Sequence, residues 1–126
     1  MDLRQLPPHD RGRDAEARAC RFLQGRGLKL LDRNYRCRYG EIDIVMRDGP
    51  NTVFVEVRYR GNRRFAGGAE SVDYRKRSRL IAAALHYLQR HPAAAARPAR
   101  FDVIAVAPGS SGDSLQWITD AFGLEA

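Results

Sequence analysis

The chain has 126 residues, enough for one domain with one core, and 44% of them are hydrophobic and 29% charged. No apolar run is long enough to span a membrane, and the first residues lack the apolar segment of a signal peptide. Cys20 and Cys37 form no CxxC pair and do not cluster with the three histidines, which argues against a structural zinc site and favours a reducing, cytoplasmic location.

The net charge of +7 comes almost entirely from arginine, because Lys29 and Lys76 are the only lysines. Arginine binds phosphate through paired hydrogen bonds, so the composition suits a polyanionic partner, nucleic acid above all. The same excess also fits an arginine-rich surface that faces only water. Composition does not separate these two interpretations.

The first half of the chain is predicted to contain one helix and three strands. Residues 1–10, with two prolines, are expected to form a flexible leader before a single domain over residues 11–126. Apolar residues at helical spacing, followed by glycines, predict a helix. Alternating and β-branched residues predict the strands. The boundaries are a helix over 14–24, strands over 28–34, 41–47 and 52–58, a turn at 48–51 and a mobile loop over 60–69.

The second half is predicted to contain a long helix and two strands. Ser71 is expected to cap a helix over 72–89. Its predicted apolar stripe consists of Leu80, Ile81, Ala84, Leu85 and Leu88. After a low-complexity connector over 93–99 come a strand over 101–107, apolar enough to be buried on both faces, and a short edge strand over 115–119. The order α-β-β-β-α-β predicts an α/β fold, a mixed sheet flanked by helices.

Two carboxylates lie within the apolar runs of the second and third strands, Asp43 in one and Glu56 in the other. Strict alternation puts Ile42, Ile44 and Met46 on one face of the second strand and Asp43 on the opposite face. A short turn makes the strands antiparallel, so if their aliphatic residues share a face, the two carboxylates share the other. A Mg²⁺ or Mn²⁺ ion would relieve their repulsion and orient water at a phosphodiester. The alternative is a solvated face on which Glu56 pairs with an arginine.

Two helical residues are further candidates for such a site. Glu16 lies one turn from Cys20, at the edge of the apolar stripe of the first helix, and Lys76 has the same relation to Leu80 in the second. Each side chain can point toward the carboxylates on the sheet, or it can be an ordinary charge at the border of a helix stripe.

Several segments together resemble the YraN-like family of uncharacterised bacterial proteins, over about residues 12–107. They are AEARACRFLQGRGLKLLDRNYR, GEIDIV, VFVEVRYR, KRSRLIAAALHYL and RFDVIAV. That family is similar to the PD-(D/E)XK nuclease superfamily, especially to archaeal Holliday-junction resolvases. The resemblance implies a restriction-endonuclease-like fold with an α-β-β-β-α-β core, in agreement with the predicted order.

The resemblance also implies roles for individual residues. Asp43 and Glu56 match the acidic positions of the motif and would bind the metal, and Glu16 matches the first-helix glutamate of the resolvase-like members. Arg58 stands where the motif has lysine. Because arginine keeps its proton, it can hold a phosphate but cannot act as a general base. Lys76 is a candidate for a catalytic lysine relocated to a helix.

Basic residues in two expected loops are candidates for contacts to DNA phosphates. They are Arg36, Arg38, Arg60, Arg63 and Arg64. Aromatic residues alternate with them, namely Tyr35, Tyr39, Tyr59 and Phe65. Most of these rings are expected to pack at the ends of the sheet rather than to stack on bases.

The sequence therefore favours a Mg²⁺- or Mn²⁺-dependent nuclease-like protein that hydrolyses phosphodiesters in DNA, with branched DNA among its candidate substrates. The alternative is a catalytically inactive nucleic-acid-binding module that keeps the nuclease fold, since Arg58 replaces the motif lysine. A third interpretation is an interaction protein whose basic surface meets an acidic partner. Resolvase-like relatives are dimers, so the resemblance also implies a candidate homodimer.

Overall fold

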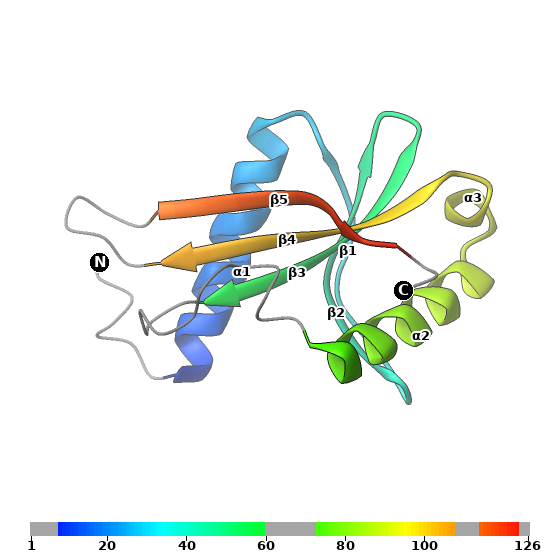
Figure 1. The fold of residues 1–126 in the computed structure, drawn as a ribbon. Helices are drawn as coiled ribbons and strands as arrows, with labels where there is room; N and C mark the ends of the chain where they lie inside the picture. The colour runs from blue at the N-terminus through cyan, green and yellow to red at the C-terminus, as the bar shows by residue number, and fades with distance from the viewer. Residues whose placement is uncertain (1–7, 60–72, 108–113, 124–126) are drawn as a thin grey trace.

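The computed structural model describes residues 8–59, 73–107 and 114–123. Its elements, in chain order, are α1 (Pro8–Gly25), β1 (Lys29–Cys37), β2 (Gly40–Asp48), β3 (Asn51–Tyr59), α2 (Tyr74–Arg90), α3 (Pro92–Ala95), β4 (Ala99–Ala107) and β5 (Ser114–Phe122) (Figure 1). This order confirms the predicted α-β-β-β-α-β core with one more strand. The expected loop over 60–69 and Ser71 lie outside the described residues.

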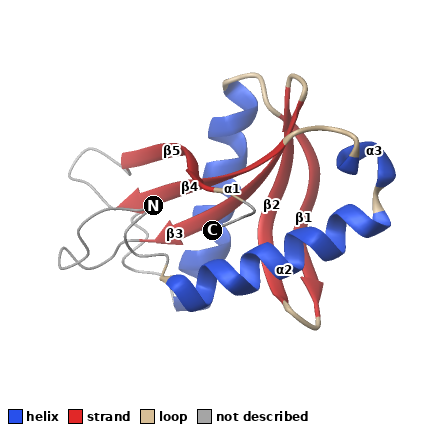
Figure 2. Cartoon of the chain, turned by 45° about the vertical axis from the view of Figure 1, so that its right-hand side comes forward, coloured by secondary structure: helices blue, strands red, loops and turns tan. Residues whose placement is uncertain are grey.

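The strands form one five-stranded sheet in the order β1-β2-β3-β4-β5. Within it β3 and β4 are parallel, and the other neighbouring pairs are antiparallel. A parallel pair needs a long crossover connection, which contains α2 and α3. The two long helices lie on opposite sides of the sheet (Figure 2). The mixed sheet flanked by helices is the predicted fold class. None of the described helices has the length and apolar character needed to cross a membrane.

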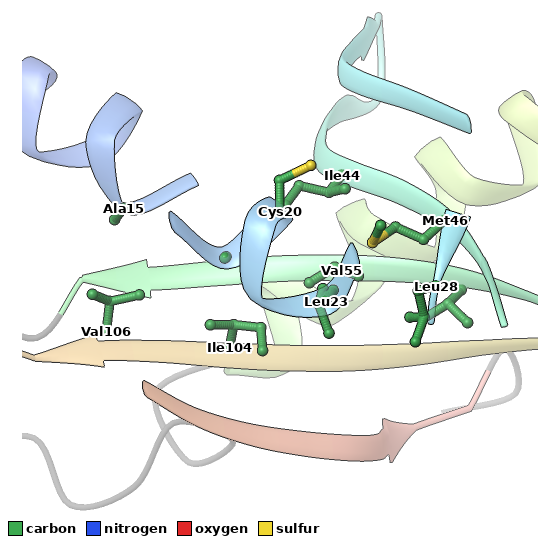
Figure 3. Packing of buried hydrophobic residues seen from close by; sticks show 11 residues of the cluster. Ala15, Cys20, Leu23, Leu28, Ile44, Met46, Val55, Ile104 and Val106 are labelled. Carbon is green, nitrogen blue, oxygen red and sulfur yellow. The ribbon is translucent and has the colours of Figure 1, made fainter. Parts of the chain in front are cut away.

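The α1 face of the sheet is closed by an apolar cluster (Figure 3). Ala15, Ala19 and Leu23 recur at helical spacing on α1 and are buried. They pack with residues of β2, β3 and β4 that point to the same face, namely Ile44, Met46, Val53, Val55, Ile104 and Val106. This packing fixes the rotation of α1 and so determines where Glu16, the neighbour of Ala15, meets the sheet.

The start of α2 differs from the prediction. The helix begins at Tyr74, and its N-cap is Asp73 rather than Ser71. The Asp73 carboxylate accepts a hydrogen bond of 2.9 Å from the backbone N–H of Lys76, which would otherwise have no partner within the helix. The cap places Lys76 in the first turn of α2.

The apolar stripe of α2 was predicted only in part. The buried residues are Leu80, Ala83, Ala84 and Tyr87. The expected Leu85 is instead 47% exposed. The stripe follows the spacing i, i+3, i+4, i+7 from Leu80, and the ring of Tyr87 supplies bulk that the prediction assigned to Leu85.

The C-terminal half also contains a short helix that the prediction missed. Pro92 begins α3, which continues into the expected low-complexity connector over 93–99, since a proline at the first helical position loses no hydrogen bond. The expected burial of β4 on both faces is confirmed from Phe101 to Val106. The last strand, β5, is an edge strand as expected, although it is longer than predicted.

The strands β2 and β3 separate halfway along their length. Their pairing runs from Asp48↔Asn51 to Ile44↔Val55 and ends there. Beyond Val55, β3 stays paired with β4, whereas β1 and β2 turn away together (Figure 1). This change of direction also explains why strict alternation predicted the wrong face for Ile42. Ile42 packs in the cluster on the α2 face, whereas Ile44 packs in the cluster on the α1 face.

Candidate functional site

The separated ends of β2 and β3 open a cleft of about 380 Å³. Its lining residues are Ala15, Glu16, Asp43, Glu56, Val57, Arg58, Tyr59 and Lys76. A second hollow of about 290 Å³ shares Asp43, Glu56 and Lys76 with the cleft and adds Gly40, Glu41, Arg79 and Leu80. All five residues predicted as catalytic therefore line one cleft, although they come from both long helices and two strands.

The side chain of Asp43 connects β2 to β3 where the backbone pairing between these strands has ended. Its Oδ2 accepts a hydrogen bond of 2.8 Å from the backbone N–H of Val57, just beyond the last residue of β3 that pairs with β2. Burial, and then the nearby Glu56 carboxylate, raise the pKa of Asp43 to about 8, although the hydrogen bond from Val57 acts in the opposite direction. An ionised Asp43 is therefore costly unless a further positive charge enters the cleft.

Glu56 is buried and is contacted by two cations. The Nζ of Lys76 lies 2.6 Å from its Oε1, and the Nη1 of Arg58 lies 3.7 Å from the same oxygen. The side chains of Lys76 and Arg58 are 32% and 26% exposed, so both also reach the open part of the cleft. The ion pair with Lys76 joins α2 to β3 at the mouth of the cleft.

Glu16 reaches the cleft from α1. Partial burial is the main cause that raises its pKa, the Glu41 carboxylate adds to it, and the Arg33 guanidinium opposes it. With its amide nitrogen turned toward the two carboxylates, Asn34 donates hydrogen bonds of 2.8 Å to Glu16 and 3.1 Å to Glu41. Glu16 thus lies between the cleft carboxylates Asp43 and Glu56 on one side and the amide of Asn34 in β1 on the other.

Glu41 and Asn34 were not predicted as site residues. Glu41 precedes the apolar run of its strand and has the pattern of a solvated end residue, and Asn34 was predicted only as the last residue of the strand over 28–34. The available signal was the asparagine itself, because an Asn inside a strand is uncommon unless its backbone or amide has a special task. Asn34 has both: a φ of 54° and two carboxylate partners.

Of the arginines predicted to contact DNA, the structure describes Arg36 and Arg38, and neither lines the cleft. Arg36 is exposed and lies 3.5 Å from Glu41, and Arg38 donates a hydrogen bond of 2.6 Å to the hydroxyl of Tyr39. Tyr35 packs against Tyr87 of α2, as expected for most of the rings. Arg60, Arg63, Arg64 and Phe65 lie outside the described residues.

The described residues contain no group of three or more His, Cys, Asp and Glu side chains arranged to hold a metal ion. Asp43 and Glu56 nevertheless fit a hard divalent cation, since Mg²⁺ commonly uses one or two carboxylates and completes its shell with water and phosphate. The raised pKa of Asp43 supports this fit, because it marks a carboxylate whose negative charge the protein alone does not compensate.

The mixed sheet, the helix on each face and the acidic cleft at the separated strands are consistent with a restriction-endonuclease-like fold. Residues 15–106 match the family model described as "Uncharacterised protein family UPF0102", and the chain belongs to that family. This confirms the resemblance to the YraN-like proteins.

Curated relatives match over nearly their whole length. A UPF0102 protein of Nitrosococcus oceani is 49% identical over 93% of this chain and 94% of its own length. One of Stutzerimonas stutzeri is 54% identical over 88% of this chain and 92% of its own. One of Xanthomonas campestris pv. campestris is 53% identical over 91% and 93%, respectively. These names give the family and no activity.

Proposed function

We propose that this protein is a divalent-metal-dependent, nuclease-like enzyme that hydrolyses phosphodiesters in DNA. The observation that carries the proposal is the single cleft in which Asp43 and Glu56 lie together with Glu16, Arg58 and Lys76. Asp43 and Glu56 would hold a Mg²⁺ or Mn²⁺ ion. Such an ion would neutralise charge on the phosphate and help to orient the attacking water.

Three residues of the cleft would bind the phosphate and transfer the protons. Glu16 accepts the proton of the attacking water, and its raised pKa makes the carboxylate a better base near neutral pH. Arg58 donates hydrogen bonds to the phosphate oxygens as negative charge builds up on them. The water oxygen forms the new bond to phosphorus, the bond to the leaving oxygen breaks, and the Lys76 ammonium donates a proton to that oxygen.

A second candidate function is a nucleic-acid-binding module without cleavage. Arg58, in the position of the motif lysine, favours it, and so does the engagement of Lys76 with Glu56 at 2.6 Å. Under either function we propose a cytoplasmic protein that contacts DNA through its arginines, and we propose a homodimer by likeness to the resolvases.

The test is a titration of Mg²⁺ or Mn²⁺ in the presence of DNA, followed by cleavage assays on branched and linear substrates. Glu56→Gln and Lys76→Ala should abolish cleavage. The exposed Asp120→Asn on β5 is the control and should cleave like the parent. Arg58→Lys keeps a donor to the phosphate and adds a side chain that can lose its proton in a partly buried site and so assist Glu16 with the attacking water, so it should cleave at least as well as the parent. Arg58→Ala should bind and cleave less.

The outcomes separate the two functions. Cleavage that depends on the metal and on Glu56 supports the nuclease. DNA binding that weakens steeply with salt, without cleavage under any metal, supports the binding module. A parent that binds neither metal nor DNA contradicts both.

A further inference from the structure

Asn34 occupies an unusual position in β1. In the register with β2 it falls between the pairs Arg33↔Ile44 and Tyr35↔Ile42, and so opposite Asp43. Its φ of 54° is in the left-handed region, which asparagine adopts more readily than most residues. The sequence therefore has a residue at this point that tolerates the backbone and also carries an amide.

The amide of Asn34 joins three elements. An asparagine carries two N–H donors, and here both are used: one reaches Glu16 of α1 at 2.8 Å and the other reaches Glu41 of β2 at 3.1 Å. Glu16 lines the first cleft and Glu41 lines the second hollow. One side chain on an edge strand thus connects an acidic residue from each of the two adjoining cavities.

This bridge has an electrostatic consequence. Two carboxylates that share one neighbour repel each other, and a half-buried Glu16 without a donor would gain by turning out to water. A hydrogen bond to a charged group is about twice as strong as one between neutral groups, so the amide gives Glu16 a defined orientation. The packing of Ala15 and Ala19 in the core positions the helix, but Glu16 is not a member of that cluster, so the cluster does not hold its carboxylate.

We propose that Asn34 is a positioning residue that holds Glu16 at the cation site. This inference rests on the proposed function, because it needs a divalent ion held by Asp43 and Glu56. It adds that Glu16, besides accepting a proton, contributes to binding that ion through an ordered water. Partners that orient the groups around a metal commonly change its affinity by 10- to 100-fold when they are removed.

The experiment is a thermodynamic cycle of Mn²⁺ affinity, measured by calorimetry on the full chain. Asn34→Gly keeps the left-handed backbone accessible and removes the amide, and it should weaken Mn²⁺ binding about tenfold. Glu16→Gln should weaken binding to a similar extent. The double variant should bind like Glu16→Gln alone, because Asn34 acts only through Glu16. Asp120→Gly is the matched control, since Asp120 has a φ of 51° on an edge strand away from the cleft, and its affinity should equal that of the parent.

A second pair of variants tests the contact without metal. Asn34→Asp fits the same space and backbone but puts a third carboxylate between Glu16 and Glu41, so it should lower the melting temperature. Adding Glu16→Gln places an amide opposite the new carboxylate and should recover part of the loss. No recovery would show that residues 34 and 16 are not in contact and would overturn the inference.

The affinity results also separate the possible failures. If the parent binds Mn²⁺ and Asn34→Gly binds equally well, the positioning role is wrong while the proposed metal site stands. If the losses of Mn²⁺ affinity in Asn34→Gly and Glu16→Gln add up in the double variant, the two residues act independently. That result would likewise overturn the positioning role of Asn34. A parent that binds no Mn²⁺ would overturn the proposed metal site and this inference together.

Discussion

Replacing Asp43 with asparagine should stabilise the metal-free protein at neutral pH. Asparagine keeps a side-chain oxygen that can accept the hydrogen bond from the backbone of Val57 at 2.8 Å in the parent. It carries no charge, so it avoids both the burial and the repulsion from Glu56 that raise the pKa of Asp43. The change should therefore remove a cost of folding while it also removes a metal ligand.

The size and sign of the effect follow from the pKa. The pKa of Asp43 is raised from 3.8 in the unfolded chain to about 8 in the folded protein. Between these values the folded state holds a proton that the unfolded state has lost, so the free energy of unfolding falls as the pH rises and levels off above about 8. One pH unit in this window is worth about 1.4 kcal/mol, which gives an upper bound of about 4 kcal/mol between pH 5 and pH 8. Water that enters the cleft reduces the cost of the charge, so we expect the free energy of unfolding to fall by about 2 kcal/mol between pH 5 and pH 8.

Urea denaturation at several pH values from 5 to 8, with a chelator present, measures this difference. The advantage of Asp43→Asn over the parent should grow as the pH rises. Millimolar Mg²⁺ should then stabilise the parent and not the variant, because only a ligand that binds the folded state raises its stability. If parent and variant lose stability in parallel across this range, Asp43 is not the group that titrates, and the electrostatic description of the cleft is wrong.

Three further predictions follow from described contacts. The Mn²⁺ affinity of the parent should rise by up to about tenfold per pH unit between pH 6 and pH 8, because the proton on Asp43 competes with the metal, and calorimetry should show a weaker dependence in Asp43→Asn. Asp73→Ala should cost about 1 kcal/mol in thermal unfolding, since it removes the N-cap of α2, whereas Ser78→Ala in the body of the same helix should cost less. Trp117→Phe should cost about 1–3 kcal/mol in urea, because its Nε1 donates at 2.9 Å to the buried Asp102, and a normal stability would mean that Arg100 and the backbone N–H of Asp120 satisfy that carboxylate without it.

The elements were predictable where the local pattern agrees with the tertiary environment. The runs around Val55 and Ile104 are rich in β-branched residues and bounded by turn or loop residues, so their strands were found. The stripe of α2 was harder because alanines carry little hydrophobic signal, and only the packing distance shows that Ala83 is inside while Leu85 is outside. Local sequence describes the helix but not how closely it lies on the sheet.

The site was predictable as a set of residues but not as a geometry. The resemblance assigned Asp43 and Glu56 to one motif, and the structure brings both to one cleft. The separation of β2 from β3 has no local signal, since the residues on either side of it remain regular strand. The asparagine at position 34 was a visible signal within a predicted strand, but its two carboxylate partners could not be found, because they depend on the register of β1 and on the rotation of α1 together.

The parallel pairing of β3 with β4 has a consequence for biosynthesis. Val55 pairs near Asp102, so β3 leaves the ribosome long before its second neighbour exists, and until then one edge of an apolar, β-branched run stays open. Glu56 is the charge inside that run, and a charge within such a segment opposes aggregation. We therefore expect the carboxylate that we propose for metal binding also to protect the nascent chain from aggregation. Sedimentation of chains that end before Ala99 would show whether Glu56→Gln makes them aggregate.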